Sequence, residues 1–259
     1  MLIFNRQSFF LHRYRALKNF DQYDFLIKEV AFNIIDRLFD FEKTFDICVD
    51  IGARKGYFRN LVGHKVLNLI ETEYGESNLS ANSGVNISKI VTDDEVLPFA
   101  NIDLILSNLN LHFVNDLPGA LVQIKHALTP GGIFIGTMFA HPTLSILKEA
   151  MLEYELNKYN QVSPHIIPMV DLTQAASLLQ RAGFAMPVVD SFEIQAEYDS
   201  LLGLFKDLKG MGETNILKKM KNYGLSKDSL LEIEQIYRKL CDGKIIANFE
   251  ILTLTGFRS

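Results

Sequence analysis

Several residue types are scarce in this chain, and each scarcity excludes a class of protein. There is no tryptophan, and the only cysteines are Cys48 and Cys241, too few for a disulfide framework or a cysteine-based zinc cluster. No apolar run approaches the ~18–20 residues that a membrane-spanning helix needs. We also expect no secretory signal, because Asn5 and Arg6 interrupt the first apolar stretch. We therefore expect a protein of a reducing compartment, located in the cytoplasm.

An excess of positive charge is lacking as well. The 26 lysines and arginines are outnumbered by 31 aspartates and glutamates, which gives a net charge of −5, whereas dedicated nucleic-acid binders are usually basic. Two local basic stretches could contact RNA or an acidic carrier protein, but a solvated helix face is the more frequent explanation of such runs. They comprise Arg13, Tyr14, Arg15 and Lys18, and Lys218, Lys219 and Lys221.

Apolar segments are abundant, and their spacing predicts an α/β fold. Residues 24–41 place apolar side chains at helical spacing. Further along, short apolar runs alternate with helical stretches, a pattern typical of a doubly wound, largely parallel sheet. The predicted strands are residues 45–50, 65–72, 88–92, 102–107, 132–138, 187–195 and 249–257. No helix follows the last strand, which suits a strand added antiparallel to its neighbour.

Two regions are longer than the crossovers of such a sheet require. Residues 142–168 and 198–242 are largely helical, and long insertions of this kind usually shape a substrate site or a partner surface. We predict one domain over residues 1–259. It would consist of an N-terminal helical lid (1–41), a cofactor-binding core (45–140) and the two helical insertions.

The turn after the first predicted strand carries the clearest chemical signal. Asp50 ends the strand, and a glycine-bearing turn with Gly52 and Gly56 leads into a predicted helix. Glu73 follows the second strand about twenty residues further on, where a carboxylate can accept both hydroxyls of a ribose. Asp93 follows the third strand and could accept from an adenine amino group. The turn amides and the helix start would face a carboxylate or phosphate.

Glycine spacing separates two kinds of nucleoside cofactor. A dinucleotide fingerprint has three glycines in the pattern GxGxxG, whereas Gly52 and Gly56 are four apart, as in an acidic-x-G-x-G-x-G pattern without its middle glycine. The latter pattern suits the amino and carboxylate groups of S-adenosylmethionine. In the alternative interpretation Gly52 merely makes a tight turn, but the register of Glu73 and Asp93 favours a cofactor crevice.

The chain resembles the class I S-adenosylmethionine-dependent methyltransferases in five segments, in this order: DIGARKGY, IETEYGES, VTDDEVLPF, SNLNLHFVNDLPGAL and LTPGGIFIGTMF. Within that superfamily it is similar to the branch of complex I assembly factor 5 and to the malonyl-acyl-carrier-protein methyltransferases. The similarity to the assembly-factor branch extends to IFNR, SPHIIP, RAGF and DLKGMGETN. Because IFNR is similar to the start of a mature domain, we do not expect the basic N-terminus to be a transit peptide.

The resemblance implies a Rossmann-like, seven-stranded sheet and S-adenosylmethionine as cofactor. It implies these contacts: Asp50, Gly52, Ala53 and Gly56 at the methionine end, Glu73 at the ribose, Asp93 and Asp94 at the adenine, and Asn108 near the methyl group. The chain departs from the pattern at Arg54, where glycine is expected. Arg54 would obstruct the site, displace the loop, point outward, or pair with the carboxylate of the cofactor.

Candidates for direct chemistry are few. His112 follows the fourth strand and could act as a general base or orient a substrate, or it could be a packed histidine that fixes the loop. Tyr57 could pack over the methionine or within the fold. His141 and His165 flank an insertion, but no metal-ligand spacing is present, so we predict no metal site. An arginine hydroxylase, the activity associated with the assembly-factor branch, would need an oxygen-activating centre that the sequence does not reveal.

The function predicted from the resemblance is that of a methyltransferase-like enzyme acting on a protein or a carrier-bound substrate, with a complex I subunit as one candidate partner. Methyl transfer needs little beyond alignment and exclusion of water, so the lack of an obvious base is compatible with it. Three alternatives stay open. They are a non-catalytic assembly protein with a degenerate cofactor site, an arginine hydroxylase of a complex I subunit, and a malonyl-carrier-protein methyltransferase.

Overall fold

The computed structural model describes residues 2–73, 86–218 and 225–259. The backbone divides into two compact units, each assembled from separate segments of the chain. The core unit comprises residues 24–139, 170–191 and 252–259, and the helical unit comprises residues 1–23, 140–169 and 192–251. We describe each unit by itself.

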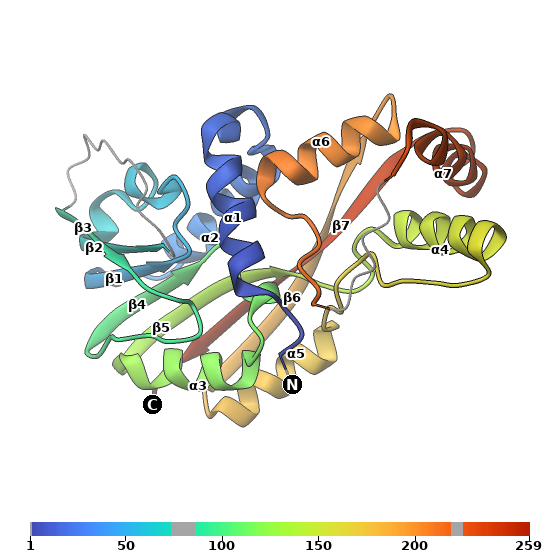
Figure 1. Ribbon diagram of the computed structural model, residues 1–259. Coiled ribbons are helices and arrows are strands. Elements are labelled where there is room, and N and C mark those ends of the chain that lie inside the picture. Colours follow the sequence, from blue (N-terminus) through green and yellow to red (C-terminus); the bar gives the residue numbers. More distant parts are fainter. Residues whose placement is uncertain (1, 74–85, 219–224) are drawn as a thin grey trace. The chain divides into compact units, whose positions relative to one another are not determined.

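A seven-stranded sheet confirms the predicted fold class (Figure 1). The strand order is β3-β2-β1-β4-β5-β7-β6, and the pairs β1–β2, β1–β4, β2–β3 and β4–β5 are parallel. Eight consecutive residues at the end of β5 are buried, as expected of a parallel strand covered on both faces. The strands are β1 (Phe45–Ile51), β2 (Val66–Glu73), β3 (Asn86–Val91), β4 (Ile102–Ser107), β5 (Leu128–Phe139), β6 (Ala185–Glu197) and β7 (Ile246–Phe257).

Among the described residues of the core unit, the α-helices are α2 (Phe25–Phe39), α3 (Leu117–Ala127) and α5 (Leu172–Ala182). The α2 helix buries one apolar face, including Leu26, Val30 and Ile34, so residues 24–41 of the segment predicted as a lid pack in the core unit. The cap of α3 is Asp116, whose side chain accepts from the Gly119 amide. Whether residues 1–23 act as a lid stays a prediction.

The helix predicted after Gly56 is reduced to two short 3₁₀ turns, η2 (Tyr57–Asn60) and η3 (Gly63–Lys65). Gly56 precedes η2 in the left-handed conformation (φ +70°) without a side-chain cap, and Gly63 has φ +54°. The side chain of Arg59 is bound to Glu71 in β2. The positive φ angles and the bond between Arg59 and the next strand accompany short 3₁₀ turns in place of a regular α-helix, and local propensity does not register such long-range contacts.

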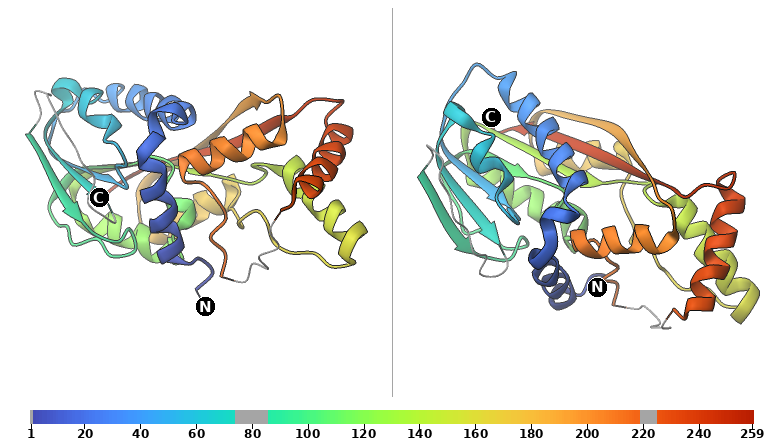
Figure 2. Two further views of the ribbon diagram at one scale, coloured as in Figure 1. Left: turned by 45° about the horizontal axis from the view of Figure 1, so that its top comes forward. Right: turned by 90° about the horizontal axis from the view of Figure 1, so that it is seen from above.

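The helical unit contains α1 (Arg6–Ala16), η1 (Leu17–Gln22), α4 (Ser145–Tyr159), α6 (Leu201–Met211) and α7 (Lys227–Leu240), together with residues 192–197 of β6 and 246–251 of β7. The α4 and α7 helices lie side by side, as the views in Figure 2 show. The region 142–168 contains α4, and the described part of the region 198–242 contains α6 and α7. None of the helices in the described part of the chain is long and apolar enough to cross a bilayer.

The DLKGMGETN segment ties the N-terminus to the rest of the helical unit. Gly210 in α6 packs against the ring of Tyr23. Glu213 forms an ion pair of 3.3 Å with Arg13 in α1, and both side chains are almost fully buried. Thr214 lies 2.7 Å from a ring nitrogen of His12. The segment therefore holds α1 within the helical unit. Arg13 is buried in this contact and does not belong to a solvated basic face.

The contact at Gly210 gives a stability prediction with a control in the same helix. A Cβ at Gly210 would lie 2.1 Å from the Tyr23 ring, whereas a Cβ at Gly203 would meet nothing closer than 3.5 Å. We expect Gly210→Ala to lower the free energy of unfolding by about 1–3 kcal/mol through overpacking. Gly203→Ala should leave it unchanged or raise it by up to ~1 kcal/mol, because alanine favours the helix. Urea denaturation measures both, and equal effects of the two variants would contradict the prediction.

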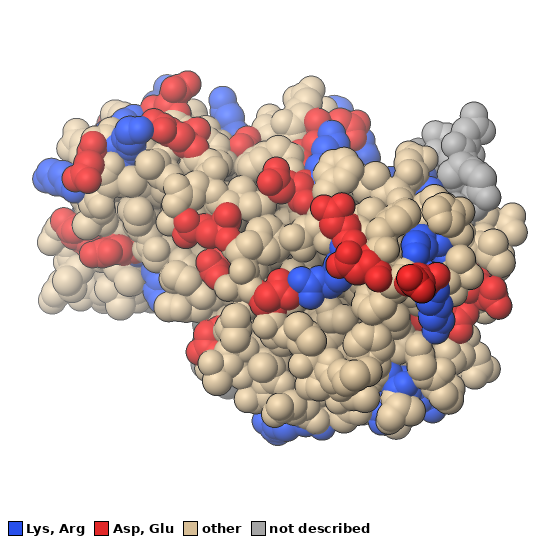
Figure 3. Space-filling model, turned by 180° about the vertical axis from the view of Figure 1, so that it is seen from behind, with Lys and Arg blue, Asp and Glu red and all other residues tan. Residues whose placement is uncertain are grey.

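Charge is mixed over the face of the molecule that Figure 3 shows. On the face in Figure 3, acidic and basic side chains are interspersed, and no continuous basic field is visible. Of the two basic stretches noted in the sequence, Lys219 and Lys221 lie outside the described residues. The visible distribution, like the net charge, does not favour a nucleic-acid surface.

Candidate functional site

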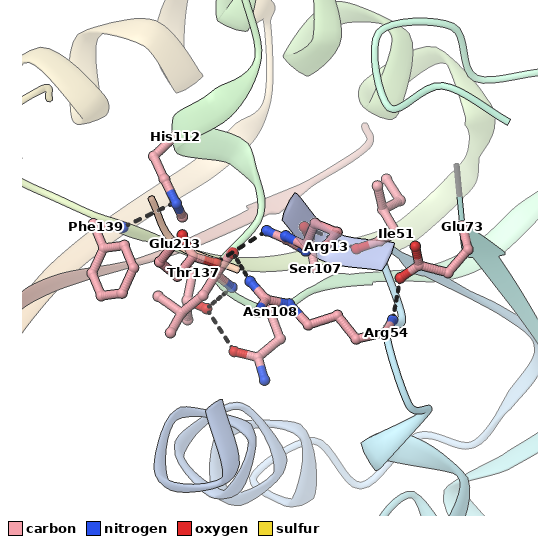
Figure 4. Close-up of polar contacts among 11 residues, drawn as sticks. Arg13, Ile51, Arg54, Glu73, Ser107, Asn108, His112, Thr137, Phe139 and Glu213 are labelled. Atoms are coloured by element: carbon pink, nitrogen blue, oxygen red, sulfur yellow. Dashed lines mark hydrogen bonds and ion pairs between the residues drawn. The ribbon is translucent and has the colours of Figure 1, made fainter. Parts of the chain in front are cut away.

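The carboxyl ends of β1, β2 and β4 bring several of the predicted site residues together within the core unit, among them Arg54, Glu73 and Asn108 (Figure 4). Asp50 in β1 lies opposite Glu71 in β2 and Leu106 in β4. A cavity of only about 10 Å³ lies at this edge. It is lined by Ile27, Asp50, Gly52, Ala53, Arg54, Tyr57, Phe58 and Asn108.

Two buried polar side chains at this edge lack hydrogen-bond partners among the described residues. One is Asp50, whose Oδ1 accepts no hydrogen bond, and the other is Asn110, whose amide oxygen and nitrogen are both unsatisfied. Both residues are at most 1% exposed. Leaving such groups unpaired costs about 1–3 kcal/mol each, so an arrangement of this kind is typical of a binding site.

Gly52 is required where it stands. Its φ is +71°, and a Cβ at this position would lie 2.5 Å from the side chain of Asn110. The absent side chain therefore allows the turn to approach Asn110 closely. Sequence reasoning missed Asn110. Its signal was a second asparagine two residues after Asn108 in the loop that follows β4.

The pKa of Asp50 is raised well above its usual range. Burial is the main cause, the negative charges of Glu71 and Glu73 add to it, and the positive charge of Arg59 opposes it. Glu71 is the neighbour of Asp50 across the β1–β2 pair. A cationic ligand group beside Asp50 would relieve this electrostatic cost.

The shift predicts how stability depends on pH. Because the folded-state pKa of Asp50 is raised above the unfolded value of about 3.9, the folded state holds this proton more tightly. The contribution of this proton to the free energy of unfolding is fully present below pH ~4. It is lost as the pH rises toward the raised pKa of Asp50. Asp50→Asn, which cannot ionise, should lose less stability over that interval than the wild type. Urea denaturation at several pH values measures this, and parallel pH profiles for the two proteins would contradict it.

A buried ion pair supports the same edge. Arg59 binds both carboxylate oxygens of Glu71 in a two-pronged arrangement, and both side chains are at most 5% exposed. A Cβ at Gly56 would collide with both partners, so glycine is needed here for space as well as for its φ of +70°. Arg59 and Glu71 were not among the site residues predicted from the sequence. An acidic residue inside an otherwise apolar strand was the available signal.

Arg54 fills the centre of the site. It is only 2% exposed, and its guanidinium donates to the backbone oxygen of Leu109 at 2.9 Å. Its backbone amide donates to the carboxylate of Glu73 (Figure 4). The possibility that Arg54 points outward is therefore wrong: its side chain crosses from the loop after β1 to the loop after β4.

The backbone explains why glycine is expected at position 54. Gly52, Arg54 and Gly56 all have positive φ, at +71°, +53° and +70°. A non-glycine residue in this conformation is strained by roughly 1–2 kcal/mol. Leu109, whose carbonyl receives the Arg54 guanidinium, also has a positive φ of +46°. Backbone strain is thus present on both sides of the Arg54 contact.

The turn amides are already used within the protein. Gly52 N donates to the Thr72 hydroxyl at 3.2 Å, Ala53 N donates to the Thr72 carbonyl at 3.0 Å, and Gly56 N donates to the Ala53 carbonyl. With the Arg54 amide on Glu73, these groups do not present the open anion cradle that the glycine turn predicted. Asp50 and Asn110 offer the unsatisfied polar groups instead.

Asn108 has a structural role. Its side-chain nitrogen donates to the carbonyl of Ile27 in α2 at 2.9 Å, and its oxygen accepts from the Thr137 hydroxyl at 3.3 Å. Asn108 lines the small cavity, but both ends of its amide are engaged. Its contact with a methyl group stays a prediction.

His112 is a packed histidine in this structure. It is 4% exposed, and its ring lies 4.4 Å from that of Phe113 and 4.8 Å from that of Phe139. The Phe139 amide approaches its Nδ1 at 3.5 Å. Tyr57 is likewise engaged in the fold, since its hydroxyl donates to Asp24 at 2.6 Å. These surroundings favour the structural interpretation of both residues.

The acidic residues after β3 lie beside the end of β2. The Thr92 amide donates to the Glu73 carbonyl at 3.0 Å, which places Asp93 next to Glu73 along the edge of the sheet. The Asp93 carboxylate accepts from the Glu95 amide at 3.0 Å, and Asp94 is 3% exposed. The order Asp50, Glu73, Asp93 along the edge therefore follows the prediction.

Metal ligands do not gather in the part of the chain that the structure describes: no group of three or more histidine, cysteine, aspartate or glutamate side chains is placed to hold an ion there. His165 lies 2.9 Å from a carboxylate oxygen of Glu155. Neither this pair nor His141 belongs to the edge where Asp50 lies.

Comparison with known proteins identifies the family. Residues 22–187 match the family profile described as "Methyltransferase domain", which covers more than half of the chain. The chain belongs to the class I S-adenosylmethionine-dependent methyltransferases. The assignment confirms the superfamily that the five sequence segments indicated.

Individual relatives show which members of the superfamily this chain is similar to. This methyltransferase-family chain is 35% identical over 251 residues to a zebrafish (Danio rerio) protein named "Arginine-hydroxylase NDUFAF5, mitochondrial", which covers 94% of this chain and 78% of the relative. It is 29% identical over 170 residues to a malonyl-[acyl-carrier protein] O-methyltransferase of Xylella fastidiosa, covering 64% of this chain and 56% of that protein. The crystal structure of the YcgJ protein from Bacillus has the same fold, with a TM-score of 0.56, 15% identity and coverage of 87% and 98%.

S-adenosylmethionine is the cofactor of this methyltransferase family, and the polar groups at the site fit it. Its methionine end carries an ammonium and a carboxylate. The unsatisfied Asp50 carboxylate suits the former, and the unsatisfied Asn110 amide suits either group. A cavity of about 10 Å³ is far too small for the cofactor, and the Arg54 side chain is one of the groups that line it.

Proposed function

We propose that this protein is a methyltransferase-like enzyme that binds S-adenosylmethionine at the β1–β2–β4 edge and acts on a protein or carrier-bound substrate. A complex I subunit is the partner class favoured by the similarity to the NDUFAF5 proteins. The observation that carries the proposal is the pair of buried, unsatisfied side chains, Asp50 and Asn110, beside Gly52.

The proposed contacts follow the order of groups along the edge of the sheet. Asp50 and Asn110 would hold the methionine end, with Gly52, Ala53 and Gly56 leaving room for it. Glu73 would accept the ribose hydroxyls after its bond to the Arg54 amide is released. Asp93 and Asp94 would lie nearest the adenine. Asn108 would keep α2 against the sheet at the side of the pocket.

Calorimetry with S-adenosylmethionine tests the site directly. We expect saturable binding by the wild type and a loss of about tenfold or more in affinity for Asp50→Asn, because a charge-assisted contact to the ammonium disappears. A matched control is Asp103→Asn, a core-unit aspartate that binds Thr129 and the Ile47 amide and does not line the cavity. Absence of heat and of a thermal shift at millimolar ligand, in the wild type and in Arg54→Gly alike, would overturn the proposal.

Product analysis tests the substrate class. The purified protein would be incubated with S-adenosylmethionine and either malonyl-carrier protein or a co-expressed complex I partner, followed by mass spectrometry. Added mass of one methyl group on either substrate supports methyl transfer. An added oxygen on an arginine of the partner would instead support hydroxylation, and a protein that binds cofactor but leaves both substrates unmodified would contradict the enzymatic proposal.

One observation favours a second candidate function. The Arg54 side chain is buried and hydrogen-bonded in the space that a cofactor would need. A non-catalytic assembly protein that kept the fold and lost the cofactor would have such a site. Restoration of binding by Arg54→Gly, with none in the wild type, would support this second function over the first.

A further inference from the structure

The helical unit contains a cavity that the proposed cofactor site does not use. Its volume is about 630 Å³, within the range of small-molecule sites. None of its lining residues lines the cavity at Asp50. The apolar wall includes Leu2, Ile3, Leu152, Ile166, Ile167 and Leu217.

Three chain segments form the wall, and hydrogen bonds fix them to one another. Asn215 donates through its side-chain nitrogen to the carbonyls of Pro164 and His165, at 3.0 and 2.9 Å. The Lys218 amide donates to the carbonyl of Ile3 at 3.0 Å. The SPHIIP segment thus lines this cavity, and Asn215, the last residue of DLKGMGETN, is bound to it. These hydrogen bonds join the segments that form the wall.

A buried carboxylate anchors the SPHIIP segment. Glu155 in α4 accepts from the Ser163 amide at 2.6 Å and lies 2.9 Å from Nε2 of His165. Glu155 is 4% exposed and is not a lining residue. Its carboxylate is therefore engaged by Ser163 and His165, two residues of the wall.

The charged groups that do line the cavity are cations. Lys148 in α4 and Lys218 both lie on its wall, and no carboxylate side chain does, counting the residues that the structure describes. Both lysine side chains are on exposed residues, so they sit at the mouth rather than in the interior. An apolar interior with cations at the mouth is complementary to an apolar chain that ends in an anion.

A second, smaller cavity places polar groups at one end. It has a volume of about 140 Å³ and shares Lys148 and residues 166–168 with the larger cavity. Its other lining residues include His141 and Ser145, which can donate hydrogen bonds. We call the 630 Å³ cavity the apolar chamber and the 140 Å³ cavity the polar chamber. Lys148 lines both.

We propose that the apolar chamber of the helical unit binds a long-chain carboxylate, with the chain against Leu152, Ile166 and Leu217 and the carboxylate at Lys148. The chain length would set affinity, because each methylene removed from water adds to binding. The carboxylate would set orientation, since it pairs with Lys148 beside the polar chamber.

Calorimetry with sodium dodecanoate, below its micelle concentration, tests the proposal. We expect one saturable site, an affinity at least tenfold higher than that of octanoate, and weaker binding of the uncharged dodecanol. Lys148→Gln should weaken dodecanoate binding about fivefold or more. Lys158→Gln is the matched control, because Lys158 is in the same helix, pairs with Glu232 and does not line the cavity, and it should bind as the wild type does.

A second variant tests the chamber itself. Leu152→Trp keeps the wall apolar and reduces its volume, so dodecanoate should bind at least tenfold more weakly while octanoate loses less. Absence of saturable dodecanoate binding would overturn the proposal, as would unchanged affinity in both Lys148→Gln and Leu152→Trp. Binding of an apolar peptide without binding of dodecanoate would also overturn it, in favour of a protein partner. Loss of cofactor binding at the Asp50 edge would not affect these outcomes.

Discussion

Replacing Arg54 by glycine is expected to raise the affinity for S-adenosylmethionine by about tenfold or more, equivalent to ~1.4 kcal/mol. In the wild type the Arg54 guanidinium must release the Leu109 carbonyl before the site can open. A hydrogen bond from a charged group is worth about 1.5–3 kcal/mol, and glycine removes that competing contact. Glycine also accepts the φ of +53° at this position without strain. Calorimetry on both proteins provides the measurement.

Arg54→Ala separates the side chain from the backbone. Alanine removes the guanidinium and keeps a Cβ at positive φ, so a comparable gain in affinity would locate the obstruction in the guanidinium. A gain with glycine alone would locate it in the Cβ or the loop conformation. Unchanged affinity in both variants would show that Arg54 does not obstruct the cofactor, and the small volume of the cavity would then need another explanation.

Arg59→Met is expected to lower the free energy of unfolding by about 3–5 kcal/mol at neutral pH. The Glu71 side chain is 1% exposed and lies opposite Asp50, so removing Arg59 leaves a buried carboxylate uncompensated beside a second one. Methionine preserves most of the volume, which confines the effect to the lost charge and hydrogen bonds. Urea denaturation of the two proteins gives the difference.

Two further variants bracket that result. Adding Glu71→Leu to Arg59→Met should recover most of the lost stability, because an apolar pair can replace a buried ion pair. Lys244→Met breaks an exposed pair with Glu197, whose side chain is 59% exposed, and should cost at most ~1 kcal/mol. A loss below that value for Arg59→Met would show that the buried pair does not stabilise this edge of the sheet.

Local pattern predicted the sheet well, for a physical reason. The strand at residues 102–107 was predicted at its observed bounds, and the others within a few residues, because strands buried on both faces are continuous apolar runs. The cofactor turn was also recognisable, since Asp50, Gly52 and Gly56 lie within seven residues of one another. Both signals are contained in short stretches of sequence.

The features that the sequence did not predict depend on contacts between distant residues. The helix expected after Gly56 gives way to 3₁₀ turns, with Arg59 bound to Glu71 in the next strand. Arg54 points inward because its guanidinium binds the Leu109 carbonyl. Leu109 lies 55 residues further along the chain, so the sequence near Arg54 does not reveal this contact. Asn110 became a candidate only when the fold placed it against Gly52. Spacing along the chain carries no information about such pairs.

The way the chain threads through its two compact units limits how the protein can be divided. It passes from one unit to the other after residues 23, 139, 169, 191 and 251. No single cut therefore yields a fragment that holds one complete unit and nothing else, and the apolar chamber alone draws on residues near 2, 152, 166 and 217. A shortened protein that contains one unit alone would have to join its three separate segments with new linkers. Studies of either site are best carried out on the intact polypeptide.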